Sequence, residues 1–454
     1  MLGAGHTSPT AAEVPVASRR LPPSEPLSTL VRLFLFEVGV AADEAAAALA
    51  PLTLPGAARL GLVSRRGDRV EPLVRLVPSG DLVFASDLRA ERDDHVMGVA
   101  PSSALLGNLT VRRPVERALD VGTGSGIQAV LAARHARTVL ATDVSERALA
   151  FAAFNALLND CANIEFRRGS FFEPVAGERF DLIVSNPPFV ISPGLEFVYR
   201  DAGLQGDGVS ERMVRGAAEH LADGGLAHVL VTWVHEPGGD WSAPLRAWVE
   251  GSGCDALFLR YTSDDPLTYA ARWNPPERAG AAVLAETLDR WLAYYRELGI
   301  EAIAYGAAVL RRRQGANWVL AEDAPERIVP AGEHVARLIE AQDFLQRTRD
   351  LAEERLTLVP GHVLEQALHL DGGTFNVESA AIRLLDGLGF QAGIDVFFGH
   401  LLSRLDGRRT VREAAAETAA ALGPEGVGAG ELGAAVLPVV RRMVALGFLV
   451  PGEH

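Results

Sequence analysis

The sequence predicts an α/β protein with a mostly parallel central sheet, flanked at each end by a small, mainly helical domain. Three observations lead to this prediction. Apolar strand-like runs alternate with helical runs through the middle of the chain, which is typical of a parallel sheet covered on both faces. A glycine-rich turn follows the first of these strands. The length of 454 residues exceeds what one ordinary core requires, so two or three domains are expected.

The predicted strands are short apolar runs, and helical patterns separate most of them. The strands are expected at residues 117–121, 138–142, 163–167, 180–185, 226–234, 255–261 and 302–310, and the clearest helices at 146–158, 210–221 and 278–298. Ligands of such sheets bind beyond the carboxyl ends of the strands. We therefore expect the functional residues at those ends.

The two ends of the chain have a different character. Residues 1–26 are small, polar and proline-containing, and we expect a disordered lead-in there. Residues 27–92 and 321–454 each combine short helices with a tight-turn signal, which favours winged-helix modules, although alanine-rich helices can pack in other ways. The α/β domain then occupies residues 93–320.

Composition limits the classes of function. The net charge is -15, and every one of the 43 basic residues is Arg; this charge argues against a broad nonspecific nucleic-acid surface without excluding a local basic patch. The two cysteines and scattered histidines suggest no metal site. Apolar runs of the roughly 18 residues that a membrane span needs do not occur, and the first residues lack a secretory signal pattern, so a cytoplasmic location is expected.

The glycine-rich turn is the first candidate site. An apolar strand containing Asp120 runs into Gly122, Gly124 and Gly126, and a helix-like run follows. Glycines let the backbone approach a ligand closely, and the helix N-terminus offers free N–H groups. Asp143 ends the next strand, where an acidic side chain can bind both hydroxyls of a ribose. A tight βαβ turn without a ligand and an NAD site remain alternatives at this point.

The second candidate site follows another apolar strand, residues 180–185, which ends directly in Asn186-Pro187-Pro188-Phe189. A planar nitrogen is a poor nucleophile while its lone pair is delocalised. Hydrogen bonds from its two N–H groups to the Asn186 side-chain oxygen and the Pro187 carbonyl would orient it and stabilise the positive charge that develops during attack. The prolines stiffen the turn, and Phe189 offers a flat face for stacking. In isolation, a capping Asn before two prolines would be the commoner explanation.

Together these motifs resemble a known enzyme family. Asp120-Val121-Gly122-Thr123-Gly124-Ser125-Gly126 resembles motif I of class I S-adenosylmethionine-dependent methyltransferases, and Asn-Pro-Pro-Phe about 60 residues later resembles the acceptor motif of N-methyltransferases. The resemblance covers about residues 94–234 and implies a Rossmann-like seven-stranded sheet with S-adenosylmethionine as cofactor. It also implies cofactor contacts from Asp120, Gly122, Thr123, Gly124, Gly126, Asp143, Ser170, Phe171 and Asn186, with Ser170 standing where Asp is common.

The resemblance points to two kinds of acceptor. The stretch through Asp207-Gly208 is similar to release-factor glutamine methyltransferases, whereas Phe189 is more typical of ribosomal-RNA guanine-N2 methyltransferases. The acidic charge favours a protein or peptide amide, with N-methylation of a base in rRNA or tRNA as the alternative. A third reading is a cofactor-sensing protein that binds DNA or a peptide, which the intact acceptor motif disfavours.

Further residues are candidates for substrate contacts because of their position after the strands. They are Tyr199 and Arg200, which follow Phe189, and Trp233 and His235, which end the fifth strand. For His235 an ordinary surface histidine is the more common role. Residues 96–103 are expected either to close over the cofactor or to form a core segment or an ordinary loop, and residues 264–276 to cap the acceptor pocket. The pattern does not indicate an oligomeric state.

Overall fold

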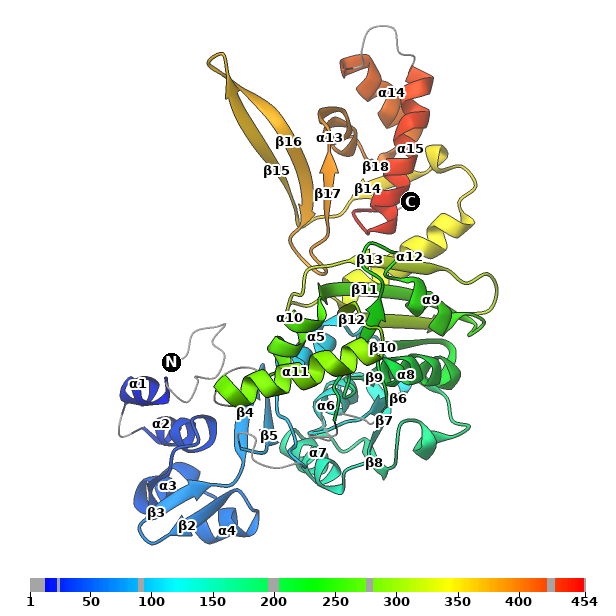
Figure 1. The fold of residues 1–454 in the computed structure, drawn as a ribbon. Coiled ribbons are helices and arrows are strands. Elements are labelled where there is room, and N and C mark those ends of the chain that lie inside the picture. Colours follow the sequence, from blue (N-terminus) through cyan, green and yellow to red (C-terminus); the bar gives the residue numbers. More distant parts are fainter. Residues whose placement is uncertain are drawn as a thin grey trace. The chain divides into compact units, whose positions relative to one another are not determined.

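The computed structural model describes residues 13–22, 25–88, 94–194, 204–274, 281–422 and 429–452 (Figure 1). The chain forms two compact units. The first consists of residues 1–106, 114–258 and 263–317, and the second of residues 107–113, 259–262 and 318–454. Each unit is described separately below.

The central sheet confirms the predicted α/β architecture. Its strand order is β13-β11-β12-β10-β9-β6-β7-β8, and the pairs β6–β7, β7–β8, β6–β9 and β9–β10 are parallel, whereas β10–β12 is antiparallel. It has eight strands where the resemblance implied seven, because β13 adds to the edge. In chain order the strands are β6 (Val115–Val121), β7 (Ala136–Asp143), β8 (Ile164–Arg168), β9 (Phe180–Ser185), β10 (Leu221–His235), β11 (Cys254–Asp264), β12 (Ala302–Arg312) and β13 (Val319–Asp323).

Helices bury this sheet on both faces. Every residue from 227 to 233 of β10 is buried, although successive side chains point to opposite faces. The helices of this unit are α5 (Pro101–Leu109), α6 (Ile127–Ala133), α7 (Glu146–Leu158), α8 (Gly208–His220), α9 (Ala243–Val249), α10 (Pro266–Trp273) and α11 (Ala281–Glu297), with a 3₁₀ turn, η2, at Glu173–Val175. No helix within the described ranges has the length and apolar character needed to cross a bilayer.

The topology places the functional motifs. From β6 the chain proceeds to β7 and β8 on one side, then returns to add β9 on the other side of β6. This reversal creates a switch point between β6 and β9, where a crevice opens beyond the strand ends. The glycine turn follows β6 and the Asn-Pro-Pro-Phe motif follows β9, so the two motifs lie on adjacent strands at this point.

The N-terminal region combines helices and strands. A small sheet, β1-β3-β2, packs with helices around a core that includes Leu33 and Val70, and a separate hairpin, β4–β5, follows. Helix α1 lies within the segment expected to be a disordered lead-in, where Val14 packs against Leu35 and Phe36. The elements are α1 (Val14–Arg19), α2 (Pro26–Leu30), η1 (Val31–Leu35), β1 (Val40–Ala41), α3 (Ala42–Leu49), α4 (Leu54–Arg59), β2 (Val63–Arg66), β3 (Arg69–Pro72), β4 (Arg75–Ser79) and β5 (Leu82–Ser86).

The C-terminal region is also mixed. It contains two three-stranded sheets, β18-β14-β19 and β15-β16-β17. Its elements are α12 (Gly332–Arg347), η4 (Leu351–Glu353), β14 (Arg355–Leu358), β15 (His362–Asp371), β16 (Thr374–Leu384), β17 (Gln391–Ile394), α13 (Val396–Leu402), β18 (Asp406–Thr410), α14 (Val411–Leu422), α15 (Ala429–Ala445) and β19 (Leu449–Pro451).

The prediction of mainly helical terminal domains was therefore wrong, since both are mixed α/β. Most strands of these regions are two to five residues long, too short to produce a clear period-2 pattern beside alanine-rich helices. The two long strands, β15 and β16, are exposed over most of their length and lack the continuous apolar runs of the central strands.

Candidate active site

The glycine turn after β6 adopts a backbone that requires glycine. Gly122, Gly124 and Gly126 have φ values of 70°, 55° and 82°, in the left-handed region that other residues rarely adopt. Space is a second constraint at Gly126, because an added Cβ would lie 2.9 Å from the Cα of Ala152 in α7. The first two glycines thus shape the turn, and the third also lets α7 approach it.

Asp120 supports this turn from the end of β6. Its carboxylate accepts hydrogen bonds from the Thr123 hydroxyl at 2.6 Å and from the Ala129 backbone N–H at 2.9 Å. Burial raises the pKa of Asp120 to about 7, against the lowering effect of these two bonds. Asp120 and Thr123 both line the adjacent cavity.

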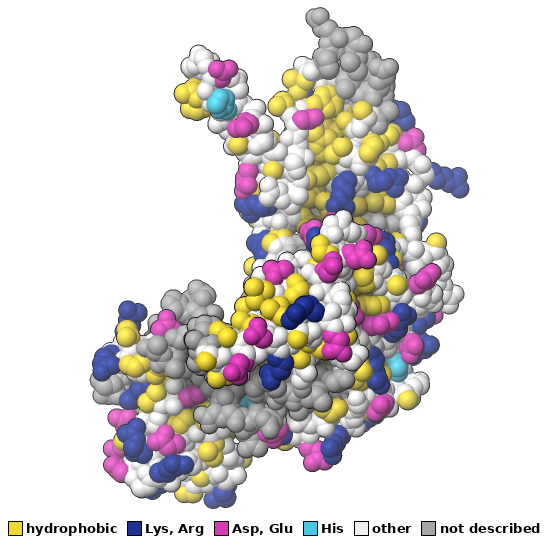
Figure 2. Space-filling model, viewed as in Figure 1, with side chains coloured by type: hydrophobic (Ala, Val, Ile, Leu, Met, Phe, Trp, Pro, Cys, Tyr) yellow, Lys and Arg dark blue, Asp and Glu magenta, His cyan; other side chains and the backbone are white. Residues whose placement is uncertain are grey.

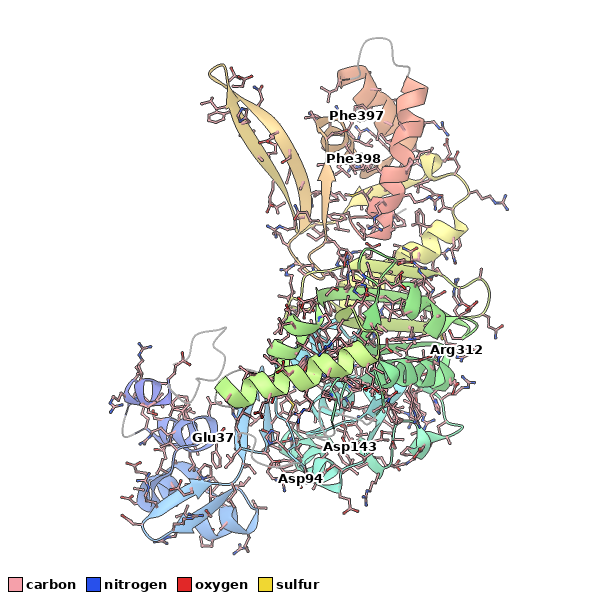
Figure 3. The ribbon with its side chains drawn as sticks, viewed as in Figure 1. Glu37, Asp94, Asp143, Arg312, Phe397 and Phe398 are labelled. Carbon is pink, nitrogen blue, oxygen red and sulfur yellow. The ribbon has the colours of Figure 1, made fainter. Side chains whose placement is uncertain are left out.

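Asp143 lies at the carboxyl end of β7 and is labelled in Figure 3. It accepts hydrogen bonds from the backbone N–H groups of Gly124 and Ser145, both at 2.9 Å. Burial raises the pKa of this carboxyl. The side chain is therefore held in position before any ligand arrives, and its two oxygens can accept from adjacent hydroxyls of a ribose.

Ser170 and Phe171 follow β8 and line the same cavity. Phe171 has a φ of 49°, an uncommon conformation for an aromatic residue, and the Arg212 guanidinium lies 4.2 Å from its ring centre. Strained residues of this kind gather at ligand sites. The pair supplies a polar and a flat apolar surface, as a planar heterocycle needs.

The acceptor motif begins where β9 ends. The buried Ser185 hydroxyl donates to the Val121 carbonyl at 2.7 Å, which fixes the end of β9 against the end of β6. The Asn186 Nδ2 donates to the Ser102 hydroxyl of α5 at 3.1 Å. This bond engages the donor end of the amide, so Oδ1 is the end suited to accept an N–H from a substrate.

Phe189 is backed by a cluster of aromatic side chains. Its ring centre lies 5.3 Å from that of Tyr305 and 6.3 Å from that of Trp273. The Ile191 backbone N–H donates to the Tyr269 hydroxyl, and the Tyr295 hydroxyl donates to the Ile191 carbonyl. Helices α10 and α11 thus hold the segment that follows the motif.

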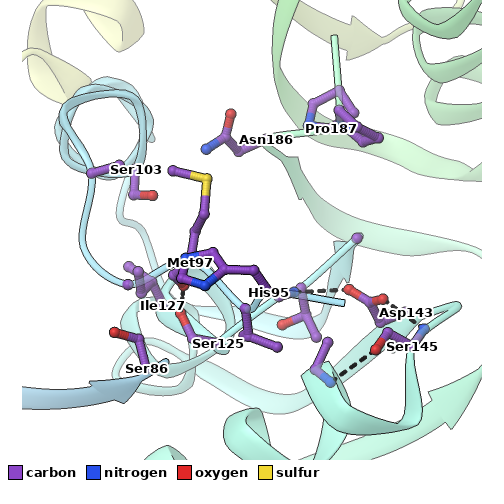
Figure 4. A pocket seen from close by; sticks show the side chains of 18 of the residues that line it. Ser86, His95, Met97, Ser103, Ser125, Ile127, Asp143, Ser145, Asn186 and Pro187 are labelled. Carbon is purple, nitrogen blue, oxygen red and sulfur yellow. Dashed lines mark hydrogen bonds between the residues drawn. The ribbon is translucent and has the colours of Figure 1, made fainter. Parts of the chain in front are cut away.

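One cavity of about 1640 Å³ unites the two motifs. Drug-sized ligands occupy pockets of about 300–1,000 Å³, so this cavity has room for a cofactor together with part of an acceptor. Figure 4 shows Asn186 and Pro187 across the cavity from Asp143 and Ser145, with Met97 extending toward Asn186. Of the predicted cofactor and acceptor residues, it is lined by Asp120, Gly122, Thr123, Gly124, Asp143, Ser170, Phe171, Asn186, Pro187 and Phe189.

The other predicted residues lie elsewhere. Gly126 packs against α7 beside the cavity. Trp233 is fully buried and donates from its indole N–H to the Trp241 carbonyl, while the His235 ring bonds the Ser263 hydroxyl at 2.8 Å, and neither lines this cavity. Tyr199 and Arg200 fall outside the described residues. Residues 96–100, Ser102 and Ser103, and Arg272 and Trp273 from the segment 264–276, also line the cavity.

Asn155 is a residue that sequence reasoning missed. This fully buried side chain of α7 exchanges two hydrogen bonds with the backbone of Ala85 in β5, and its Nδ2 also donates to the Ser125 carbonyl at 2.8 Å. It thereby joins the β4–β5 hairpin to the glycine turn. An Asn within an otherwise alanine- and leucine-rich helix is the signal that could have identified it.

Comparisons with known proteins agree with this geometry. Residues 99–235 match the Methyltransferase small domain family, and residues 2–73 and 336–451 match two domain families of unknown function, DUF7059 and DUF7782. A release factor glutamine methyltransferase of Xylella fastidiosa is 31% identical over 247 residues, covering 50% of this chain and 82% of that protein.

Two further similarities are more limited in extent or identity. A ribosomal protein uL3 glutamine methyltransferase of Bradyrhizobium diazoefficiens is 38% identical over 148 residues, covering 30% of this chain and 46% of its own length. A crystal structure of a methyltransferase from Pyrococcus furiosus aligns with 50% of this chain and 89% of its own, at 18% identity and a TM-score of 0.31. Several curated relatives are matched over about half of their length or less.

The sheet, the cavity and the family match define a class I S-adenosylmethionine-dependent methyltransferase. Within that class, the chain belongs to the family of the release factor glutamine methyltransferases. The predictions of an S-adenosylmethionine-dependent N-methyltransferase, and of a resemblance to the glutamine methyltransferases, are confirmed.

Proposed function

We propose that this protein methylates the side-chain amide nitrogen of a glutamine in a protein substrate. The observation that carries the proposal is the orientation of Asn186 in the cavity that also contains the glycine turn. A dinucleotide-binding protein or a cofactor sensor has no need of an amide clamp at this place. The family relationship agrees, because the two curated relatives above are named as glutamine methyltransferases.

The residues present fit S-adenosylmethionine, which supplies an electrophilic methyl group on its sulfonium sulfur. Asp143 would accept from the ribose hydroxyls, since its carboxylate is already positioned by Gly124 and Ser145. The glycine turn would admit the methionine portion. Ser170 and Phe171 would contact the adenine.

The acceptor residues raise the reactivity of the amide nitrogen by position and charge. Asn186 Oδ1 and the Pro187 carbonyl would each accept one N–H of the glutamine amide, which aims the nitrogen into the cavity. As the nitrogen lone pair forms the new N–C bond, the electrons of the methyl–sulfur bond stay with sulfur. The nitrogen becomes positive, both carbonyl oxygens stabilise it, and one N–H proton then leaves to solvent.

The charges around the cavity favour a protein over a nucleic acid. Arginines that line it are paired with carboxylates: Arg147 with Asp87, Arg168 with Glu146, Arg272 with Asp264, and Arg75 with Glu37 at 3.8 Å. A phosphate backbone requires cations that remain available to neutralise it. The net charge of -15 points the same way. Methylation of a base in RNA is the second candidate, favoured only by the Phe in the acceptor motif.

We also propose that both terminal regions are winged-helix modules, bounded at residues 27–92 and 321–454 around a catalytic domain at 93–320. In support, the N-terminal elements follow the order helix, strand, two helices, two strands, with the three strands in one sheet. The C-terminal region carries helices α13, α14 and α15 beside the β18-β14-β19 sheet.

The test uses labelled S-adenosylmethionine with two candidate substrates, a purified release factor and ribosomal protein uL3. The label is then located by mass spectrometry of the digested protein. We expect one methyl group on a glutamine side chain of one of the two proteins. Label in RNA, removed by ribonuclease and resistant to protease, would instead establish the nucleobase alternative.

A further inference from the structure

The C-terminal unit carries a hairpin that extends beyond the rest of its sheet (Figure 1). β15 pairs with β16 from His362 to Asp371, whereas β17 pairs only with residues 380–383 of β16. Within the described residues, the distal part of the hairpin therefore has two strands. A two-stranded hairpin is marginally stable in water unless a further surface packs against it.

One face of this hairpin is mostly apolar, with His362 and Gln366 as its polar members on β15. The pairs Leu368–Val377 and Leu370–Phe375 lie directly opposite each other across the strands. They share their face with Leu364 of β15. We call this set (Leu364, Leu368, Leu370, Phe375 and Val377) the hairpin apolar face. Its side chains are between 42% and 66% exposed.

On β16 the same face is buried where the hairpin begins. Ile382, opposite Leu364, and Leu384, opposite His362, are each 2% exposed. The apolar residues of this face thus form a stripe that extends from the domain core to the hairpin tip, with Gln366 as a polar residue between Leu364 and Leu368. The stripe is a core-type surface whose outer part has no cover among the described residues.

A bulge keeps the stripe on one face. Ala367 pairs with Ser379 and Leu368 with Val377, so Glu378 is an extra residue in β16. Because side chains alternate between faces, a hairpin without this extra residue would turn Phe375 and Val377 away from Leu368 and Leu370. The bulge therefore maintains an exposed apolar surface, which marks an interaction site when it serves no core.

We propose that the hairpin apolar face binds the protein that carries the acceptor glutamine, through an apolar segment flanked by basic side chains. The proposal rests on the proposed function, since the partner is taken to be the methylated protein. It assigns the hairpin to substrate recognition outside the catalytic cavity.

The charges of the hairpin decide the kind of partner. Residues 362–384 contain the acidic Glu365, Asp371 and Glu378 and one Arg, Arg383. Arg383 bonds Glu365 at 2.5 Å, so Asp371 and Glu378 carry the net negative charge of the hairpin. Figure 2 shows acidic side chains beside hydrophobic ones near the tip. These carboxylates would repel RNA and anionic lipid. A second copy of this chain, binding through the same hairpin, would place acidic residues against acidic residues. A basic polypeptide is the complementary partner.

The test compares two pairs of substitutions on opposite faces of the same strands. Leu370→Ser with Phe375→Ser removes apolar side chains, and His369→Ser with Asn376→Ser is the matched control on the polar face. Both are made in the full chain and checked for folding by circular dichroism. We measure methylation of whole release factor and whole uL3, and of a short peptide carrying the methylated glutamine.

The apolar-face variant should raise KM for the whole protein by about 10- to 100-fold, as expected for loss of central interface residues. Its kcat, and its KM for the short peptide, should match those of the wild type. The control variant should match the wild type in kcat, in KM for the whole protein and in KM for the short peptide. Asp371→Arg should also raise KM for the whole protein substrate, and this increase should be smaller at high salt. Equal KM values for the two double variants would overturn the inference.

Failure of the proposed function would look different. In that case the wild type methylates neither protein, and binding of the same purified proteins to the full chain is measured directly. Binding that only the apolar-face variant weakens would still support the inference. Binding of neither protein, or an effect of the variant only on self-association, on RNA binding or on vesicle binding, would overturn it.

Discussion

The hydrogen bond from Asn186 to Ser102 leads to a prediction about a residue that acts through Asn186. Asn186 Nδ2 donates to the Ser102 hydroxyl at 3.1 Å, which leaves Oδ1 to accept from the acceptor. Ser102→Ala removes this restraint and allows the amide to turn its NH₂ group toward the substrate. Ser102 is therefore a positioning residue.

The size of the effect follows from the bond that is lost. A neutral hydrogen bond contributes about 0.5–1.5 kcal/mol, so kcat should fall by about 2- to 13-fold in Ser102→Ala. Removal of the clamp itself in Asn186→Ala should be more severe, at about 10²- to 10³-fold, by analogy with loss of a transition-state hydrogen bond. The affinity for S-adenosylmethionine should change little in either variant.

The assay is steady-state methyl transfer at saturating cofactor, with the cofactor Kd measured by calorimetry. Ser102→Thr keeps the hydroxyl and should recover most of the activity, which a purely structural role would not predict. Ser403→Ala, a substitution at an exposed serine of the C-terminal unit, serves as a control. If kcat of Ser102→Ala equals that of the wild type, or if Ser102→Thr is as impaired as Ser102→Ala, the positioning argument fails.

Three further predictions concern cofactor binding and stability. Asp143→Asn should weaken S-adenosylmethionine binding by about 10- to 160-fold, the equivalent of a charged hydrogen bond worth about 1.5–3 kcal/mol, and calorimetry showing less than a twofold change would exclude the ribose role. Gly126→Ala, at a φ of 82° and with its Cβ 2.9 Å from the α7 backbone, should lower the free energy of unfolding in urea by about 2–4 kcal/mol. Gly238→Ala, at a φ of 75° with no atom near the added Cβ, should lower the free energy of unfolding clearly less than Gly126→Ala does. Equal decreases in the two variants would contradict the packing argument. Burial lowers the pKa of His334 to about 4 from its ordinary 6.5, so the unfolded chain binds the proton more strongly between these values. Stability should then fall by up to about 3 kcal/mol as the pH drops from 6.5 to 4, and a His334→Gln variant with an undiminished pH dependence would refute this contribution.

Local features of the sequence were sufficient to predict the two halves of the site. The glycines after β6 are needed where the backbone takes a positive φ, and the Asn-Pro-Pro-Phe motif begins where β9 ends. Both motifs are contiguous, and parallel strands bring their carboxyl ends to one edge. The position of the cavity could therefore be predicted without coordinates, and the class of enzyme followed from the resemblance of these motifs to a known family.

Contacts between distant segments could not be derived in this way. Ser102 meets Asn186 from 84 positions away, and Asn155 meets Ala85 from 70 positions away. Trp233 was a candidate for the substrate because it lies near a strand end, yet β12 pairs with β10 through Trp233 and His235, and the indole is buried. The position of a residue near the end of one strand does not show whether the neighbouring strand extends far enough to cover it.

The C-terminal hairpin was missed for a different reason. The bulge at Glu378 shifts the alternation of apolar and polar residues by one position within β16. A period-2 search reads such a strand as two short, unrelated pieces. The feature that preserves the apolar face in three dimensions is the one that conceals the strand in the sequence.

The central claim is that Asn186 and Pro187 direct a methyl group onto the amide nitrogen of a protein glutamine. Its most direct test is mass spectrometry of release factor and uL3 after incubation with S-adenosylmethionine and either the wild type or Asn186→Ala. We predict one methyl group on a glutamine side chain with the wild type, and a rate at least about 10²-fold lower with Asn186→Ala at an unchanged cofactor Kd. Undiminished transfer by Asn186→Ala, or methylation at an atom other than a glutamine amide nitrogen, would contradict the claim.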